Sequence, residues 1–467
     1  MAFASAASPG RIFTMSVIRK TELTKVKFGR SDMMVTECCI GTMTWGSFNG
    51  KEEEAFAQLD KAVEMGANFF DTAELYPVAF NYGKTTEAWM GKWLTARTRE
   101  GKIKRQDLYI ATKCNPSRIG GPDWIEGVDG PGKNMPAGYC HSYEADILEK
   151  SCRASIERLC CGYIDLYQLH WPTRDCPIFG CFSFSPAGVN RPMPHANTLA
   201  PGEPGYAVFE RQLLAIKRLL DAGLIKNWGL SNENAFGITM FCTLADKLGM
   251  ARPVSCQNDF SLLNRTYESD TWEAAYRFGV VGLPYGCLAG GVLTGKYFDG
   301  TKWSQAAAAD RPLDLCRMRK EKDFQPRYGM PMAMLAAAEY IKLAEQYGIT
   351  PTELALSWAR QRQCNTSIIT GTTTVLQMEE CINAFKIELP EELMKAVDVL
   401  HEQYRHPTQY FVDKPACMDA KWLGSAARSA KDPQGRLTSA ARSPLVRVAV
   451  AAAAAGAAVA LLITRPK

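Results

Sequence analysis

Four side chains suited to acid–base chemistry follow apolar runs in the first half of the chain. Asp71, Lys113 and His170 each stand at the end of such a run, and Tyr76 follows the first of them by five residues. Reduction of a carbonyl needs a proton donor beside a positive charge, because negative charge develops on the oxygen. Tyr76 next to Lys113 meets both needs, since an ammonium would pull the phenol pKa below about 10. We expect Asp71 to keep Lys113 charged and His170 to orient the substrate oxygen.

Each of these residues also has a structural interpretation when taken alone. A histidine in Leu169-His170-Trp171 is more often a core residue, and an Asp-Thr pair is common at the end of a strand. A lysine or aspartate buried at a strand end is costly unless the two pair with each other. Four such residues at matching strand ends therefore favour one shared site.

None of these side chains can supply a hydride, so carbonyl reduction requires a dinucleotide cofactor. Residues 290–296 match the pattern Gly-x4-Gly-Lys, but Tyr297 stands where Mg²⁺ ligation needs serine or threonine, which argues against a nucleotide triphosphatase. We expect this loop to hold a pyrophosphate through backbone N–H groups and Lys296. Residues 371–374, Gly-Thr-Thr-Thr, open a helical stretch and offer a second phosphate position.

The elements that must position these residues alternate between short β-branched runs and stretches of helical period. The strand-like runs cover residues 35–41, 68–72, 108–113, 163–170, 225–231, 254–259, 280–285 and 367–371. The helical stretches cover residues 52–65, 86–96, 143–159, 208–222, 235–248, 267–278, 332–362 and 375–385, with a further helix near 390–404. Residues 350–353, Thr-Pro-Thr-Glu, form a capping-box pattern.

Eight strands alternating with eight helices predict an α/β fold, a (β/α)₈ TIM barrel. A doubly wound sheet typically stops at about five to seven strands. The connections 171–206 and 286–330 are long and rich in Gly, Pro and Ser, and both follow strands. We expect them to form long loops at the C-terminal face of the barrel, where active sites lie; decoration without function is the alternative.

Positive charge is confined to the two ends of the chain. Residues 1–30 carry six Lys/Arg and one Glu, and residues 414–467 carry nine Lys/Arg and two Asp, which leaves the body at a net charge of −7. An acidic body argues against nucleic-acid binding. We divide the chain into a basic N-terminal extension (1–30), a barrel (31–413), a basic linker (414–444) and a candidate C-terminal membrane anchor (445–464). The extension reads either as a transit peptide or as sequence ahead of a second start at Met15.

The candidate anchor contains sixteen uncharged apolar residues, 448–463, most of them alanine, between Arg447 and Arg465. A helix of that length spans about 24 Å, against a hydrocarbon core of about 30 Å. We expect a tail that tethers the chain to an internal membrane; an alanine-rich helix that frays or lies at the interface is the alternative, and the chain would then be cytoplasmic.

The cysteines and histidines indicate a reducing intracellular compartment and no metal site. The sixteen cysteines are scattered, with adjacent pairs at Cys38–Cys39 and Cys160–Cys161 and no Cys-x-x-Cys motif. Five histidines without an HExxH motif make a zinc site improbable.

The chain resembles the aldo-keto reductases, closest to the Tas-like branch related to voltage-gated potassium channel β-subunits, over roughly residues 26–410. The resemblance rests on several short motifs. These are Gly41-Thr-Met-Thr-Trp-Gly46, Phe70-Asp-Thr-Ala-Glu-Leu-Tyr76-Pro, Ala111-Thr-Lys113, Asp165-Leu-Tyr-Gln-Leu-His170-Trp-Pro, Gly229-Leu-Ser-Asn232-Glu, Gln257-Asn, Ser261-Leu-Leu-Asn-Arg, Leu293-Thr-Gly-Lys296-Tyr and Gly371-Thr-Thr-Thr-(x)₂-Gln377.

This resemblance implies an NADPH-dependent reductase of aldehydes or ketones with a small-molecule carbonyl substrate, and a catalytic tetrad of Asp71, Tyr76, Lys113 and His170. It also implies the alternative of a slow, cofactor-loaded sensor that regulates a membrane partner. By the same resemblance, the nicotinamide contacts are Ser231, Asn232, Gln257 and Tyr285, with Gly286 and Leu288 following. The phosphate contacts are Gly295, Lys296, Arg327, Gly371, Thr373 and Gln377. Gly286 and Cys381 stand where relatives carry Ser and Asn. The sequence determines neither the substrate nor the oligomeric state.

Overall fold

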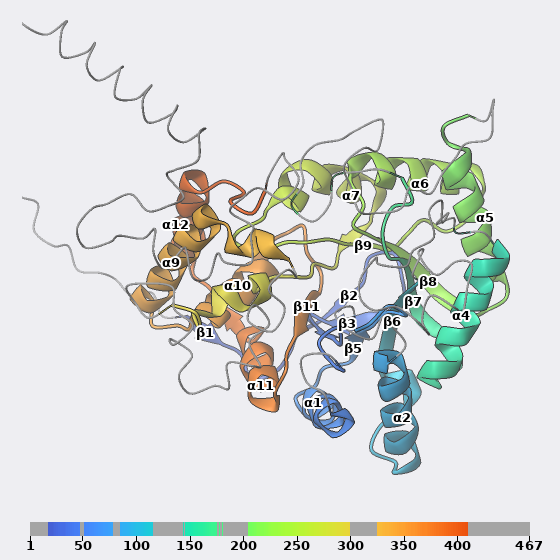
Figure 1. The fold of residues 1–467 in the computed structure, drawn as a ribbon, viewed down its shortest axis with the longest axis horizontal. Coiled ribbons are helices and arrows are strands. Elements are labelled where there is room, and N and C mark those ends of the chain that lie inside the picture. Colours follow the sequence, from blue (N-terminus) through green and yellow to red (C-terminus); the bar gives the residue numbers. More distant parts are fainter. Residues whose placement is uncertain are drawn as a thin grey trace, which may run out of the picture.

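Eight parallel strands form the centre of the molecule in the computed structural model, with helices around them (Figure 1). The structure describes residues 17–46, 51–77, 85–114, 143, 145–174, 177, 180, 204–298 and 325–409. The strands are β4 (Cys38–Gly41), β5 (Phe69–Asp71), β6 (Tyr109–Cys114), β7 (Ile164–Leu169), β8 (Ile225–Ser231), β9 (Ser255–Gln257), β10 (Val281–Gly282) and β11 (Ile368–Gly371). Their order is β10-β9-β8-β7-β6-β5-β4-β11, so from β4 to β10 each strand lies beside the one before it, and β11 lies on the other side of β4.

Backbone contacts join the two ends of this sheet. Thr366 N donates to Gly282 O at 2.9 Å, and Ile369 N donates to Pro284 O at 2.9 Å. An isolated parallel bridge pairs Gly282 with Asn365. Since β11 also pairs with β4, the sheet closes, and the predicted (β/α)₈ barrel is confirmed.

The helices cover the outer side of the strands (Figure 1). They are α1 (Glu52–Glu64), α2 (Thr85–Arg99), α4 (Ala145–Leu159), α5 (Ala207–Asp221), α6 (Ala235–Lys247), α7 (Trp272–Phe278), α9 (Pro331–Gln346), α10 (Pro351–Gln361), α11 (Val375–Ala384) and α12 (Glu391–Gln403). Three of them begin at side-chain caps: Asn234 on α6, Thr350 on α10 and Thr374 on α11. These oxygens satisfy backbone N–H groups that have no partner inside a helix.

Alternation along the strands divides the core in two. Phe69, Ala111 and Leu166 belong to a small cluster inside the barrel, whereas their neighbours Phe70, Ile110 and Tyr167 belong to the large cluster under the helices. Because side chains alternate with a period of two, the inward set continues up each strand. That set ends at Asp71, Lys113 and His170, so the pleat carries three of the predicted catalytic residues to one end of the barrel.

A hairpin missing from the sequence prediction lies against the opposite end of the barrel core. The predicted first strand, residues 35–41, is two elements, β3 (Met34–Thr36) and β4, and β3 pairs antiparallel with β2 (Lys25–Lys27). Phe28, which follows β2, is fully buried, and its ring lies 5.3 Å from that of Phe69. β1 (Ile18–Arg19) pairs with β12 (Ile387–Glu388). Both β1 and β2 lie within residues 1–30.

The predicted helix over residues 332–362 is wrong as a single element. It is two helices, α9 and α10, separated at Tyr347–Thr350. The capping box itself is present: Glu353 N donates to Thr350 Oγ1 at 3.1 Å, and Thr350 N donates to Glu353 Oε2 at 2.8 Å. A capping box starts a helix, so the helical period could not run through it.

The interpretation of this chain as a membrane protein with a transmembrane helix is not supported. Among the residues that the structure describes, no helix is long and apolar enough to cross a membrane. Residues 414–444 and 445–464, expected to form a linker and an anchor, lie outside the described residues. The domain boundaries remain predictions.

Candidate active site

The Lys113 ammonium lies at the centre of the predicted tetrad and contacts two of its members. Its Nζ donates to Asp71 Oδ2 at 2.5 Å, to the Thr72 carbonyl at 2.8 Å and to Tyr76 Oη at 3.3 Å. Strand register sets this up, because β5 pairs with β6 and Asp71 lies opposite Ala111, two residues before Lys113. An ammonium has three donors and no acceptor, so the Tyr76 oxygen accepts here and its hydroxyl can act as a donor.

His170 follows β7 and completes the cluster from the next strand. Its ring meets the Tyr76 ring edge-on, with centroids 5.7 Å apart. On the other side it contacts Trp171, with centroids 4.4 Å apart. No hydrogen-bond partner for its Nδ1 occurs within the described part of the chain. The four predicted catalytic residues are therefore brought together.

Burial lowers the pKa of both bases in this cluster, whereas the neighbouring charges raise the pKa of one base and lower that of the other. Burial lowers the pKa of Lys113, but the negative charge of Asp71 and the Tyr76 oxygen outweigh it, and the net pKa is raised. Burial, with the Lys113 charge adding to it, lowers the pKa of His170 well below its ordinary value. Lys113 is therefore a cation at neutral pH and His170 a neutral imidazole.

The residues predicted to hold a nicotinamide amide form one connected network beside the tetrad. Asn232 Nδ2 donates to the His170 carbonyl at 2.9 Å, and its Oδ1 accepts from Tyr285 Oη at 2.7 Å. Ser231 Oγ donates to the Gln257 carbonyl at 3.0 Å. Asn232 has a positive φ of 57°, a conformation that asparagine tolerates better than most residues. Burial, followed by the charge of Asp259, raises the pKa of Tyr285.

Arg327 is paired within the protein rather than directed to solvent. Its side chain is 2% exposed and contacts Asp259, with Nη2 3.0 Å and Nε 3.1 Å from Oδ2. Tyr328 Oη donates to Asp259 Oδ1 at 2.9 Å. A Cβ at Gly286 would come within 2.6 Å of Asp259 Oδ1 and 2.7 Å of Tyr328 Oη. The Asp259–Tyr328 contact thus takes the space that a side chain at position 286 would need.

The loop after β10 owes its shape to glycine. Gly290, Gly291 and Gly295 have φ of 64°, 95° and 77°, and Leu288 precedes the short helical turn Ala289–Thr294. A Cβ at Gly291 would lie 2.8 Å from Lys296 Nζ. Gly291 N donates to the Leu288 carbonyl at 2.8 Å and Gly295 N to the Val292 carbonyl at 3.3 Å, so these two N–H groups are used within the loop.

The start of α11 follows β11 directly. Burial raises the pKa of the Cys381 thiol in this helix to about 12, and the hydrogen bond with Thr370 opposes that shift. Gly371 ends β11, and Gln377 Oε1 accepts from Thr373 N at 2.9 Å and from Thr373 Oγ1 at 3.0 Å. A helix N-terminus such as this one can bind a phosphate, and the approach of Lys296 to it stays a prediction.

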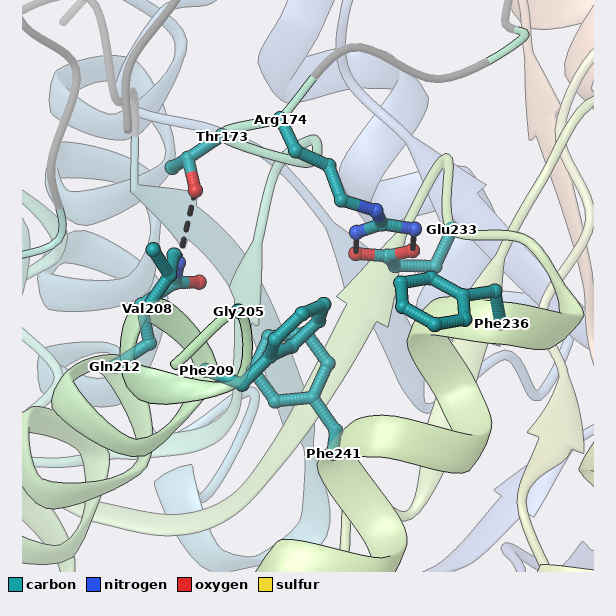
Figure 2. Close-up of a pocket in the computed structure, with 9 residues that line it drawn as sticks. All are labelled: Thr173, Arg174, Gly205, Val208, Phe209, Gln212, Glu233, Phe236 and Phe241. Carbon is teal, nitrogen blue, oxygen red and sulfur yellow. Dashed lines mark hydrogen bonds and ion pairs between the residues drawn. The ribbon is translucent and has the colours of Figure 1, made fainter. Parts of the chain in front are cut away.

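A separate cavity of about 160 Å³ lies between α5, α6 and the segment after β7 (Figure 2). Its walls are mostly apolar, with two polar contacts at the rim. Arg174 pairs with Glu233 through two hydrogen bonds of 2.7 Å, and Gln212 Nε2 donates to Thr173 Oγ1 at 2.8 Å. The Arg174 guanidinium lies over the rings of Phe209 and Phe236, 5.3 and 5.4 Å from their centroids, and the ring of Phe241 lies 4.9 Å from that of Phe209 (Figure 2).

Sequence reasoning missed several residues that shape the site. Asp259, Tyr328 and Arg174 belong to none of the quoted motifs, and Gln168 and Glu233 stand inside two of those motifs without an assigned role. One signal was available for Gln168, which stands two residues before His170 in a strand and must therefore face the same side. Nothing in the sequence pairs Asp259 with Arg327, 68 residues away.

Comparison with known proteins identifies the family. The family model described as "Aldo/keto reductase family" matches residues 37–402. The chain belongs to the aldo/keto reductase family. It is 32% identical to Protein tas of Escherichia coli (strain K12) over 381 residues, 81% of this chain and 97% of that protein.

More distant relatives in the aldo/keto reductase family differ in what their names describe. The chain is 25% identical to a probable voltage-gated potassium channel subunit beta of Arabidopsis thaliana, over 82% of this chain and 98% of that one. It is 24% identical to norsolorinic acid reductase stcV of Emericella nidulans, over 82% of each chain. Family membership supports an oxidoreductase, in agreement with the predicted resemblance.

Proposed function

We propose that this chain is an NADPH-dependent reductase that converts an aldehyde or ketone carbonyl to an alcohol. A nicotinamide dinucleotide, when bound, supplies the hydride that no side chain of the cluster can supply. Tyr76 donates the proton to the carbonyl oxygen, Lys113 stabilises the charge that develops there, and His170 orients the oxygen as a neutral hydrogen-bonding group.

The observation that carries this proposal is the position of Lys113 between Asp71 and Tyr76. One N–H reaches the carboxylate at 2.5 Å and another reaches the phenol oxygen at 3.3 Å. When Tyr76 gives up its proton, the resulting phenolate remains next to a buried cation. A proton donor of this kind is therefore already placed before any substrate binds.

The chemistry of the groups beside the tetrad suits a dinucleotide. Ser231, Asn232 and Gln257 would hold the carboxamide, and Tyr285 would lie against the nicotinamide ring. Gly286, Leu288 and Gly295 would shape the phosphate loop, and Lys296 would bind the pyrophosphate. Gly371, Thr373 and Gln377 would approach the adenosine 2′-phosphate. Because Arg327 is anchored on Asp259, it would act there from a fixed position.

The test is cofactor consumption with a panel of aldehydes and ketones. Purified protein should oxidise NADPH in a carbonyl-dependent manner, and NADH should serve less well if the 2′-phosphate contacts are as proposed. Binding of NADPH without turnover on any carbonyl would reject the reductase proposal, and failure to bind either cofactor would reject the whole site assignment.

A slow, cofactor-loaded sensor is the second candidate, and the similarity to a channel subunit beta favours it. A sensor should oxidise one equivalent of bound NADPH and then release the oxidised cofactor slowly. Comparison of the single-turnover rate with the steady-state rate separates the two functions, because a sensor that retains its oxidised cofactor has almost no steady-state turnover after the first, whereas a reductase keeps turning over.

A further inference from the structure

We propose that Gln168 is a positioning residue that holds Asp71, and through it Lys113, in place; the proposal rests on the reductase function above. Gln168 is fully buried on β7, two residues before His170. Its Cα lies opposite that of Lys113 in the β6–β7 ladder. Its side chain therefore enters the barrel at the level of the tetrad.

Asp71 divides its two oxygens between two sets of partners. Oδ2 accepts from Lys113 at 2.5 Å. Oδ1 accepts from Gln168 Nε2 at 3.1 Å and from Gln257 Nε2 at 2.9 Å. A carboxylate gripped at both oxygens cannot rotate about its terminal bond without breaking hydrogen bonds, so the amides hold Asp71 at the angle that meets Lys113.

Together with Asp71, Gln168 fixes the orientation of the Gln257 side-chain amide. Gln257 Nε2 donates to Gln168 Oε1 at 3.1 Å as well as to Asp71. Because an ionised carboxylate accepts only, both amides must direct nitrogen toward Asp71. The remaining polar atom of Gln257 is its oxygen, an acceptor, which suits the N–H₂ of a carboxamide.

The surroundings make this network costly to disturb. Gln168, Asp71 and Gln257 are 0%, 1% and 2% exposed, so water cannot replace a lost partner. The other titratable groups around Asp71 are Tyr76, Lys113, His170 and the buried thiol of Cys39 on β4, which interacts with the charges of Asp71 and Lys113. If the Gln168 amide is removed, the buried Asp71 carboxylate loses one hydrogen bond that water cannot replace. The carboxylate can then turn away from the Lys113 ammonium that it pairs with.

The first test replaces Gln168 by leucine and measures kcat and KM separately. Gln168→Leu should lower kcat by about tenfold, as loss of an outer hydrogen-bond partner typically does, while the KM for the carbonyl changes by less than about twofold. Gln212→Leu is the matched control, because it removes a buried hydrogen bond to Thr173 outside the cluster, and it should keep the wild-type kcat. Equal kcat values for Gln168→Leu and the wild type overturn the proposal.

The second test uses a carboxyl group at the same position. Two carboxyl groups this close share one proton, so Gln168→Glu should support turnover at acid pH, where the added carboxyl is protonated and its O–H donates a hydrogen bond to ionised Asp71. Its kcat should fall as pH rises and that proton is lost, whereas a purely space-filling role predicts the wild-type pH profile. A profile parallel to wild type contradicts the proposal.

A third readout needs no cofactor. Thermal unfolding of the apoprotein is measured for the wild type, Gln168→Leu, Asp71→Asn and the double variant. The decrease in the free energy of unfolding of the double variant should differ clearly from the sum of the two single decreases. Additive losses count against the contact. If Gln168→Leu does not fold, Gln168→Met takes its place, because methionine follows the same unbranched path.

These results also separate this inference from the proposed function. If the wild type consumes no NADPH with any carbonyl, the reductase proposal fails, while the apoprotein measurement still decides whether Gln168 holds Asp71. If the wild type turns over and Gln168→Leu equals it, the inference fails alone.

Discussion

The two sides of the barrel mouth are built by different means. On the β5–β7 side, Asp71, Lys113 and Tyr76 are held by one another's side chains, at hydrogen-bond distances of 2.5–3.3 Å. On the side that follows β10, the shape comes from backbone at positive φ, with Gly290 and Gly291 at 64° and 95°. A side-chain network depends on which atoms are present, whereas a backbone loop depends on which conformations are allowed. The first side should therefore respond to isosteric changes and the second to added volume.

The largest expected effect comes from removing the proton of the side-chain network. Tyr76→Phe should lower kcat by about 10²–10⁴-fold, the usual contribution of a positioned general acid. The Kd for NADPH, measured by fluorescence titration, should stay close to wild type, because the phenol hydroxyl is assigned no cofactor contact. Retained carbonyl reduction would show that Tyr76 is not the acid.

The next effect probes the charge on the loop side. Lys296→Met keeps the length of the side chain but removes its charge, and should weaken NADPH binding by about ten- to a hundredfold, the value of a charge-assisted hydrogen bond. At saturating cofactor, kcat should change far less. An unchanged Kd would remove Lys296 from the phosphate site.

A smaller effect tests volume on the same side. Gly286→Ala should lower the free energy of unfolding by about 1–3 kcal/mol, since φ is 76° and the new Cβ would meet Asp259 Oδ1 at 2.6 Å. Gly348→Ala is the control: its φ is 65° but no atom lies within 4 Å of its Cβ position. Chemical denaturation of both variants separates the contact from the strain. Equal losses would mean that the Asp259–Tyr328 contact does not restrict this position.

The smallest effect concerns protons on the network side. The pKa of His170 is lowered by burial and then by Lys113, so the unfolded chain binds a proton below about pH 6.5 that the folded chain does not. Stability should therefore fall as pH drops below about 6.5, by at most about 1.4 kcal/mol per pH unit from this residue. His170→Asn should remove that part of the slope in denaturation series. His401 and His406, whose pKa values are also lowered, contribute equally to both proteins.

The sequence predicts the side-chain network better than the loop side, and the reason is periodicity. Asp71, Lys113 and His170 stand at the ends of regular strands, so a count of eight strands is enough to place them on one rim. The partner of Arg327 depends on how the residues after β10 fold back against Asp259, and the hydrophobic periodicity of the sequence does not predict a loop contact of this kind. The missed Gln168 falls between these cases, because its face could be predicted but its contact with Asp71 needs the register of β5 against β7.

The missed hairpin has a similar cause. Residues 25–27 are Lys-Val-Lys, a run too short and too charged to read as a strand. It becomes one because Val35 and Phe28 are buried together in the inner cluster. Tertiary burial, rather than local propensity, decides such short elements.

Through that hairpin, the residues before β3 contribute to the stability of the barrel. Phe28 packs on Phe69, and burial of one such ring contributes about 1.5–3 kcal/mol. A fragment trimmed to begin at residue 31 would keep every residue assigned to catalysis and cofactor binding, yet it would expose the floor of the barrel to water. Truncated variants of this protein should therefore retain residues 17–30, because these residues cover the end of the barrel opposite the active site.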